Sequence, residues 1–244
     1  MLCGELKKLN KGNMMKTKID YSPKTLNDFV FFNNQTESII RAIVSGEYEM
    51  PQLGTTGLLF YGPAGTGKTA LAKLLPDLIE QARGGANCII EFYACGEGDE
   101  NGAKLIKDIR SKIDKNPMTY SNLRFFVFDE VDNLTVKTMK ALKGIMNESL
   151  TLFILTTNNI TQVDPILKDR CLPLPFLAAP AEKWLPLARR IATDNNLIGI
   201  EDEELLTACR KSRGSARELY RQIANVAITV NAMTADYMGT TAIG

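Results

Sequence analysis

The chain has 244 residues, of which 45% are hydrophobic and 23% are charged, the composition of an ordinary globular protein. This length allows one large domain, or one domain of ordinary size and a smaller second one. The formal net charge of +1 excludes a strong overall attraction to nucleic acid, although lysine-rich stretches at 1–20 and 104–115 can form local basic patches. The absence of histidine excludes the commonest general base and all Ser-His and Cys-His catalytic arrangements.

The five cysteines form no CxxC pair, so neither a disulfide framework nor a zinc site is expected. No run of 18 apolar residues and no apolar signal core occurs, so we expect no membrane association. These features predict a cytoplasmic or nucleoid protein. Residues 1–20 are expected to be a flexible leader, and a translation start at Met14-Met15 would make residues 1–13 an unstructured extension.

From Gly57 onward, short apolar runs alternate with longer helical patterns. The predicted elements are strands at 57–61, 88–93, 123–128 and 151–156, and helices at 68–81, 103–113 and 135–148. Continuous apolar strands separated by helices are typical of a parallel sheet that is covered on both faces. The sequence therefore predicts an α/β fold with a doubly wound parallel sheet.

The pattern changes after Pro173, where the proline-rich segment LPLPFLAAPAE is predicted to be a connector. Three helices without strands are expected to follow, at 181–195, 201–212 and 215–230. The predicted domains are an α/β domain at 21–177, a small all-helical domain at 178–232 and a loose tail at 233–244.

Residues 62–69 have the sequence GPAGTGKT, which matches the phosphate-loop pattern GxxxxGK[ST] in full. Glycines allow successive N–H groups to face phosphate oxygens, and the positive end of the following helix points to the same anion. We expect Lys68 to reach the β- and γ-phosphates of ATP and the Thr69 hydroxyl to hold Mg²⁺. A chance glycine-rich turn is the alternative, but the preceding strand and the following helix are the context that the motif requires. The predicted nucleotide-binding residues here are Gly62, Pro63, Ala64, Gly65, Thr66, Gly67, Lys68, Thr69 and Ala70.

Two carboxylates, Asp129 and Glu130, follow the apolar run FFVF. Ligands of open α/β sheets bind at the carboxyl ends of the strands, so these acids should lie beside the phosphate loop. Asp129 is predicted to bind Mg²⁺, directly or through water, and Glu130 to orient and partly deprotonate the attacking water. A solvated acidic turn is the alternative. Asn158, after the next strand, could contact the γ-phosphate or the water, or could only form a turn.

These segments together resemble the ATPase subunits of DNA sliding-clamp loaders in the AAA+ class, namely the small subunits of replication factor C and their phage counterparts. The resemblance extends over residues 21–230. The motifs that carry it, in the family's order, are YSPKTLNDFV at 21–30, GPAGTGKT at 62–69, DEVD at 129–132, FILTTN at 153–158 and KDRC at 168–171.

The resemblance implies roles that the spacing of residues does not show. The opening box, with Tyr21, Pro23 and Val30, would surround the adenine. Asn158 would be the sensor 1 residue that responds to the γ-phosphate.

The resemblance also implies functions for two arginines. Arg170 would be an arginine finger that reaches ATP on the neighbouring subunit, a task that suits a planar and permanently charged guanidinium. Arg217 would be the sensor 2 residue, which points from the helical lid to the γ-phosphate of its own subunit. An ordinary surface arginine is the alternative at both positions. The family's finger motif usually reads Ser-Arg-Cys, and Asp169 replaces the serine here.

The helix predicted at 103–113 would face DNA in a clamp loader. Lys104, Lys107 and Arg110 would contact backbone phosphates without reading the sequence; a solvated basic face is the alternative. The resemblance thus implies a Mg²⁺-dependent ATPase that assembles with other AAA+ subunits, with a pentamer favoured, and loads a sliding clamp onto primer–template DNA. Clamp-loader subunits also carry a helical collar domain, and this sequence ends about where the collar would begin.

Other functions share the same nucleotide motifs. One alternative is a different AAA+ remodeller, such as a helicase loader or a Holliday-junction motor. Another is a nucleotide-dependent scaffold with little turnover, which the intact Glu130 and Arg170 disfavour. A nucleotide kinase is disfavoured because the lid lacks a cluster of arginines for a second phosphate acceptor.

Overall fold

The computed structural model describes residues 20–52, 54–86, 88–96, 102–115, 117, 119–195, 197 and 200–240. These residues form two compact units, each described here by itself. The α/β unit is Ser22–Leu177, and the helical unit comprises the described residues from Ala178 onward together with Asp20 and Tyr21. All but the last residue of the leader expected at 1–20 lies outside the described residues.

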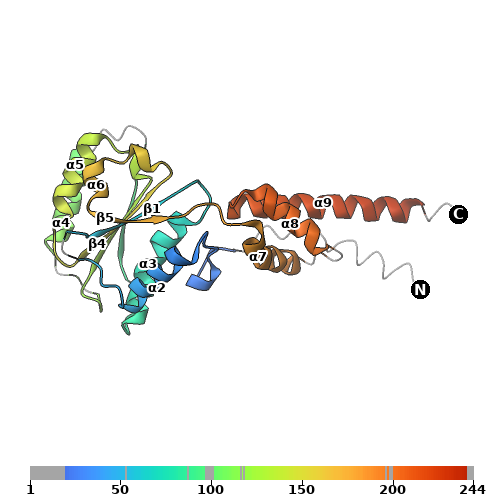
Figure 1. The fold of residues 1–244 in the computed structure, drawn as a ribbon, viewed down its shortest axis with the longest axis horizontal. Helices are drawn as coiled ribbons and strands as arrows, with labels where there is room; N and C mark the ends of the chain where they lie inside the picture. The colour runs from blue at the N-terminus through green and yellow to red at the C-terminus, as the bar shows by residue number, and fades with distance from the viewer. Residues whose placement is uncertain are drawn as a thin grey trace. The chain divides into compact units, whose positions relative to one another are not determined.

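The α/β unit is built on a five-stranded parallel sheet (Figure 1). Its strands are β1 (Gly57–Tyr61), β2 (Ile90–Ala94), β3 (Arg124–Asp129), β4 (Thr151–Thr157) and β5 (Cys171–Pro175). Their order in the sheet is β2-β3-β4-β1-β5. Strand β4 therefore lies between the strand that leads into the phosphate loop and the strand that ends in the predicted acids.

Helices cover both faces of this sheet (Figure 1). The helices of one face are α2 (Asn34–Ser45) and α3 (Lys68–Ala82), and those of the other are α4 (Gly102–Ile113), α5 (Val136–Ile145) and α6 (Pro165–Lys168). Alternate strand residues enter the two cores: Leu58 and Phe60 pack with α2 and α3, whereas Leu59 packs with α4 and α5. The predicted α/β fold with a doubly wound parallel sheet is confirmed.

Strand β5 corrects the sequence analysis, which treated the proline-rich segment as a connector. Phe176 donates its N–H to the Tyr61 carbonyl of β1 at 2.7 Å. Because N–H direction alternates along a strand, the nitrogens of Pro173 and Pro175 point to the open edge of the sheet. An edge strand needs no donor there, and so it tolerates both prolines.

Several boundaries also differ from the expected ones. Strand β2 begins at Ile90 instead of residue 88, and α5 ends at Ile145 instead of residue 148. Helix α2 was not predicted. It begins after Asn33, whose side chain accepts the N–H of Thr36 at 2.9 Å, an ordinary N-cap contact.

The helical unit consists of α7 (Ala181–Asp194), α8 (Asp202–Ser212) and α9 (Ala216–Thr240). Trp184, Leu205 and Leu219 are buried in it. The last helix continues to Thr240, beyond the residue 230 end that we expected, so most of the predicted tail is helical. Alanine and methionine are frequent in this stretch and favour helix over coil.

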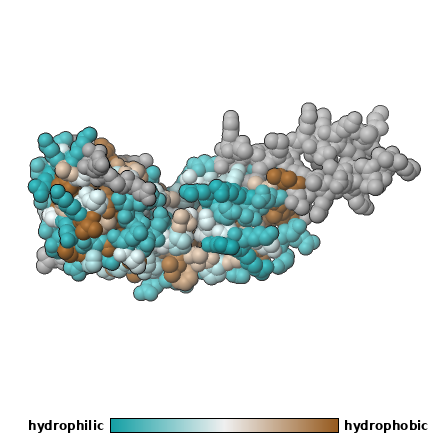
Figure 2. Space-filling model, turned by 90° about the horizontal axis from the view of Figure 1, so that it is seen from above, coloured by the Kyte–Doolittle hydropathy of each residue, from teal (hydrophilic) through white to brown (hydrophobic). Residues whose placement is uncertain are grey.

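Hydrophilic residues predominate on the face seen in Figure 2, and the hydrophobic ones form separate patches. Within the part of the chain that the structure describes, no helix has the length and apolar character needed to cross a membrane.

Candidate nucleotide-binding site

At two positions in the loop between β1 and α3, the backbone has a positive φ angle that favours glycine. Gly62 and Gly67 have φ angles of 147° and 98°. A Cβ atom on Gly62 would lie 2.2 Å from the carbonyl oxygen of Phe176, so the close approach to the residue that follows β5 also requires glycine. Among the described residues, none accepts a hydrogen bond from the N–H groups of residues 65–69. Those groups are available to an anion at the amino end of α3.

Lys68 is buried within this loop, with 5% of its surface exposed. Its Nζ donates to the carbonyl oxygens of Gly62 and Pro63, both at 2.7 Å. Burial lowers the pKa of Lys68, and the charges of Asp129 and other nearby acids oppose that shift. The ammonium group therefore lies where phosphate oxygens could replace the two carbonyls as partners.

A pair of threonines joins the phosphate loop to the acidic end of β3. The hydroxyls of Thr69 and Thr156 both donate to Oδ1 of Asp129 at 2.6 Å. Thr156, on β4, also accepts the N–H of Glu130 at 3.0 Å. The sequence analysis missed Thr156, and its signal is a hydroxyl within an otherwise apolar, fully buried strand.

Thr69 and Asp129 fit the Mg²⁺ site predicted for them. Magnesium is normally held by one or two protein ligands, water and nucleotide phosphates, not by an all-protein cage. The described residues contain no group of three or more His, Cys, Asp or Glu side chains that could hold a metal ion.

Glu130 lies directly after β3 with a left-handed backbone, at φ 59°. Its Oε1 accepts a hydrogen bond from Nδ2 of Asn158 at 3.2 Å, so two residues predicted to act together are in contact. Its Oε2 accepts from Nδ2 of Asn133 at 3.4 Å, a residue that the sequence analysis did not single out. Asp132 receives the N–H of Asn159 at 3.2 Å and so supports the turn that carries Asn158.

The segment of the opening box that lies in the α/β unit reaches the phosphate loop. A Cβ atom on Gly67 would lie 3.4 Å from Phe29, the neighbour of Val30. Tyr21 belongs to the helical unit, where its ring lies 5.7 Å from that of Tyr220 and its hydroxyl accepts from Asn195 at 3.0 Å. The adenine contacts of Tyr21, Pro23 and Val30 stay predictions.

Arg170 lies at the opposite end of the sheet from the phosphate loop. Its carbonyl accepts the N–H groups of Thr56 and Gly57 at 3.1 and 3.0 Å, which places it beside the start of β1. The five residues of β1 separate that point from the loop by about 16 Å. The guanidinium donates to the Gly54 carbonyl at 3.3 Å, and its buried Nε has no partner among the described residues. It borders a cavity of about 770 Å³ that Arg83 also lines.

Arg217 is exposed in the first turn of α9, in the helical unit. Its predicted contact with the γ-phosphate stays a prediction.

Helix α4 presents the three predicted DNA-contact residues, Lys104, Lys107 and Arg110, all of them exposed. None makes an ion pair within the described part of the chain. Lys112, on the same helix, differs, because its ammonium contacts Glu91 at 2.6 Å and Asp108 at 2.9 Å.

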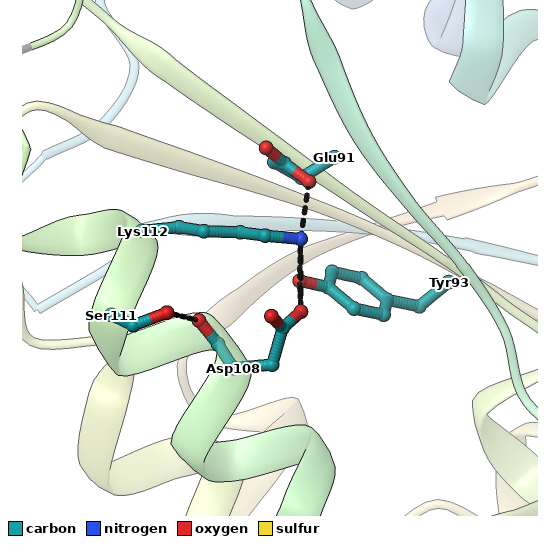
Figure 3. A network of polar contacts seen from close by, with 5 residues as sticks. All are labelled: Glu91, Tyr93, Asp108, Ser111 and Lys112. Carbon is teal, nitrogen blue, oxygen red and sulfur yellow. Dashed lines mark hydrogen bonds and ion pairs between the residues drawn. The ribbon is translucent and has the colours of Figure 1, made fainter.

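The contacts of Lys112 attach α4 to the sheet (Figure 3). Tyr93 of β2 donates its hydroxyl to Asp108 at 2.7 Å and accepts from Lys112 at 3.1 Å. Hydrogen bonding to Lys112, then to Tyr93, lowers the pKa of Asp108. The ring of Tyr93 stacks on Phe128, with centroids 5.0 Å apart. Lys112 is thus a structural cation, distinct from the exposed row on α4.

Comparison with known proteins supports the resemblance carried by the motifs. Residues 58–174 match the family described as "ATPase family associated with various cellular activities (AAA)". The chain is 28% identical over 210 residues to replication factor C subunit 4 of Caenorhabditis elegans, covering 81% of this chain and 58% of that one. It is also 28% identical over 219 residues to replication factor C small subunit 2 of Pyrobaculum islandicum, covering 88% and 65%. The chain thus spans less than two thirds of these relatives, and its predicted similarity to replication factor C small subunits is confirmed.

Solved structures with the same fold include a Holliday junction branch migration motor, RuvB, of Thermotoga maritima. The TM-score is 0.64, with 17% sequence identity, over 88% of this chain and 67% of that one. At this identity the likeness supports the fold alone.

Proposed function

We propose that this chain is an ATP-binding and ATP-hydrolysing subunit of a multi-subunit AAA+ assembly in DNA replication, which loads a sliding clamp onto primer–template DNA. The relatives named replication factor C support the replication task. The chemistry is supported by the joined Thr69, Asp129 and Thr156 side chains beside the phosphate loop, the observation that carries the proposal.

The site supports in-line attack of water on the γ-phosphate. The free N–H groups of the loop and Lys68 would bind the phosphates, and Mg²⁺ held by Thr69 and Asp129 would neutralise developing charge. Glu130 would orient the water and accept its proton, with Asn158 beside the same carboxylate. Mg²⁺ supplies Lewis-acid stabilisation of the transferring phosphoryl group when it is bound.

An arginine from a neighbouring subunit would complete this site. Arg170 is about a strand's length from the phosphate loop of its own α/β unit, so it is poorly placed to serve that loop. The same position suits a cation presented to the next chain. The guanidinium borders the cavity and makes one hydrogen bond among the described residues, to the Gly54 carbonyl, so its terminal N–H groups could bind an anionic partner.

DNA would be bound through exposed cations without base recognition. Lys104, Lys107 and Arg110 present three charges on α4 that no acidic side chain of the described residues neutralises within ion-pair distance. Such a row attracts backbone phosphates of any sequence, which suits a protein that must act at every primer–template junction.

Nucleotide binding is the first test. Replacing Lys68 with Ala removes the ammonium group at the phosphates and should weaken ATP binding by at least about a hundredfold in calorimetric titration. The matched control is Lys73→Ala on the same helix, where the exposed ammonium lies 4.0 Å from the Phe92 ring centroid and away from the loop. Equal affinity in wild type and Lys68→Ala would contradict the assignment of the loop.

The assembly is the second test. The protein would be tagged in its host, purified gently with ATP and Mg²⁺, and analysed by native mass spectrometry. Five ATPase-sized subunits with a ring-shaped clamp are expected. Six copies, or association with a helicase, would contradict the clamp-loading task and leave the ATP chemistry intact.

A further inference from the structure

We propose that Thr156 is a positioning residue of the Mg²⁺ site, which fixes the Asp129 carboxylate so that its Oδ2 atom is the oxygen left for the metal or for a metal-bound water. The inference rests on the proposed function and deepens it, because it concerns the acid that would hold Mg²⁺. Within the motif FILTTN at 153–158, only Asn158 had a predicted role.

The hydroxyl of Thr156 has a defined direction. Its oxygen accepts the N–H of Glu130 at 3.0 Å, so one side of the hydroxyl acts as an acceptor. An ionised carboxylate has no hydrogen to donate, so the contact with Oδ1 of Asp129 at 2.6 Å must use the hydroxyl hydrogen. Thr156 has 1% of its surface exposed, which leaves little water to compete for either contact. The hydroxyl is therefore a buried donor that is directed at one carboxylate oxygen.

The order of the strands puts this donor in place. In the register of β3 and β4, Leu155 lies opposite Phe128, so Thr156 comes next to Asp129 at the carboxyl end of β3. On its other side Thr156 lies opposite Phe60 of β1, the strand that leads into the phosphate loop. Every residue of β4 is buried, and β4 is the central strand of the sheet. The position of the hydroxyl is thus set by the core and not by a loop.

The two oxygens of the Asp129 carboxylate are not equivalent. Thr69 and Thr156 both donate to Oδ1, whereas Oδ2 accepts no hydrogen bond from the described residues. Thr69 is itself a predicted Mg²⁺ ligand, so its contact with Asp129 is subject to change when nucleotide binds. Thr156 has no predicted contact with nucleotide or metal, and it can hold the carboxylate in both states. Hydrogen bonds of this kind orient the carboxylates of metal sites and strengthen metal binding.

Calorimetric titration of ATP into the isolated chain tests this role without turnover. Mg²⁺ should strengthen ATP binding by the wild type relative to binding in EDTA. Thr156→Val has nearly the same shape but lacks the hydroxyl, so it should reduce that strengthening by about tenfold and leave the affinity in EDTA unchanged. An unchanged effect of Mg²⁺, or an equal loss of affinity with and without Mg²⁺, would overturn the proposal.

Thr151→Val is the matched control. Thr151 is also fully buried on β4, but its hydroxyl donates to the Ser149 carbonyl at 3.2 Å, at the amino end of the strand. This variant should not alter the effect of Mg²⁺. Thr156→Ser keeps a hydroxyl and should remain nearer to wild type. If Thr156→Val failed to fold, as judged by circular dichroism, Thr156→Ala would give the same comparison with a smaller side chain.

The Mg²⁺ dependence of ATP turnover by the assembly gives a second readout. Thr156→Val should raise the free Mg²⁺ concentration for half-maximal turnover by about tenfold, and excess Mg²⁺ should restore most of kcat. A residue that only supports the fold would lower kcat at every Mg²⁺ concentration, and that result would overturn the proposal. Absence of any Mg²⁺ effect in the wild type would instead contradict the proposed Mg²⁺ site itself, on which this inference rests.

Discussion

The two ends of the parallel sheet carry opposite kinds of chemistry. At the carboxyl end, the Thr69 and Thr156 hydroxyls donate to Asp129 beside the phosphate loop, whose N–H groups at 65–69 have no acceptor among the described residues. At the amino end, Arg170 borders a cavity with a buried Nε that lacks a partner among the described residues. The carboxyl end offers N–H donors and the Lys68 ammonium to an anion, whereas the amino end presents the Arg170 guanidinium, which makes no ion pair with the described residues. Within one α/β unit the two ends are separated by the length of β1, so the proposed arginine finger would have to serve the phosphate loop of another chain.

The largest expected effect comes from Arg170. Arg170→Ala should lower ATP turnover of the assembly about a thousandfold, the usual effect of an arginine finger, and leave ATP binding by the isolated chain unchanged. Single-turnover kinetics on the assembly and calorimetry on the isolated chain measure the two quantities. Arg170→Lys should fall between wild type and Ala, since it keeps the charge and loses the planar fork. Weakened binding by the isolated Ala variant would mean that the two ends do interact within one chain.

Glu130 should show the same division between ATP binding and turnover, with a smaller loss of turnover. Glu130→Gln keeps the shape of the side chain and removes the base, so ATP binding should persist while kcat falls by about a hundredfold or more. Phosphate release and nucleotide affinity, measured on the same preparation, separate the two effects. Glu37→Gln, in an exposed pair with Arg41 on α2, is the matched control and should change neither. Unaltered turnover in Glu130→Gln would remove Glu130 from the reaction.

A smaller effect is expected on DNA affinity. Lys107→Gln removes one exposed charge from α4, so it should weaken binding severalfold on every sequence tested. It should also reduce the slope of log affinity against log salt by about 1. Lys73→Gln, on the other side of the sheet, serves as the control. A slope that does not change would indicate that α4 faces solvent in the complex.

The smallest effect concerns stability. Lys112→Met should destabilise the attachment of α4 to the sheet by about 1 kcal/mol, since its two ion pairs are partly exposed. Faster hydrogen exchange in α4 would report the change. Fluorescence of Trp184, the single tryptophan, reports the helical unit and should not change. Lys115→Met, three residues further on, is the control. Equal exchange in both variants would show that the network of Figure 3 adds no stability.

The parts of this molecule that a sequence can predict are those encoded within a continuous segment. Glycine spacing indicates the phosphate loop, and apolar runs indicate β1 and β4. The bounds of both strands were predicted nearly correctly. The partners of Thr156 depend on which strands are neighbours, so its hydroxyl within an apolar run could not reveal that it contacts Asp129. Strand β5 was missed because proline disfavours a strand in general, and only its position at the edge makes proline acceptable.

Those same prolines limit how the molecule can associate. A strand from another chain can extend a sheet only where the exposed edge offers N–H donors at alternate residues. On β5, Pro173 and Pro175 occupy the outward positions and leave that edge without donors along its central part. The edge is thus protected from unwanted strand addition and amyloid-like pairing. Contacts between copies on this side therefore cannot use N–H donors from the central part of β5.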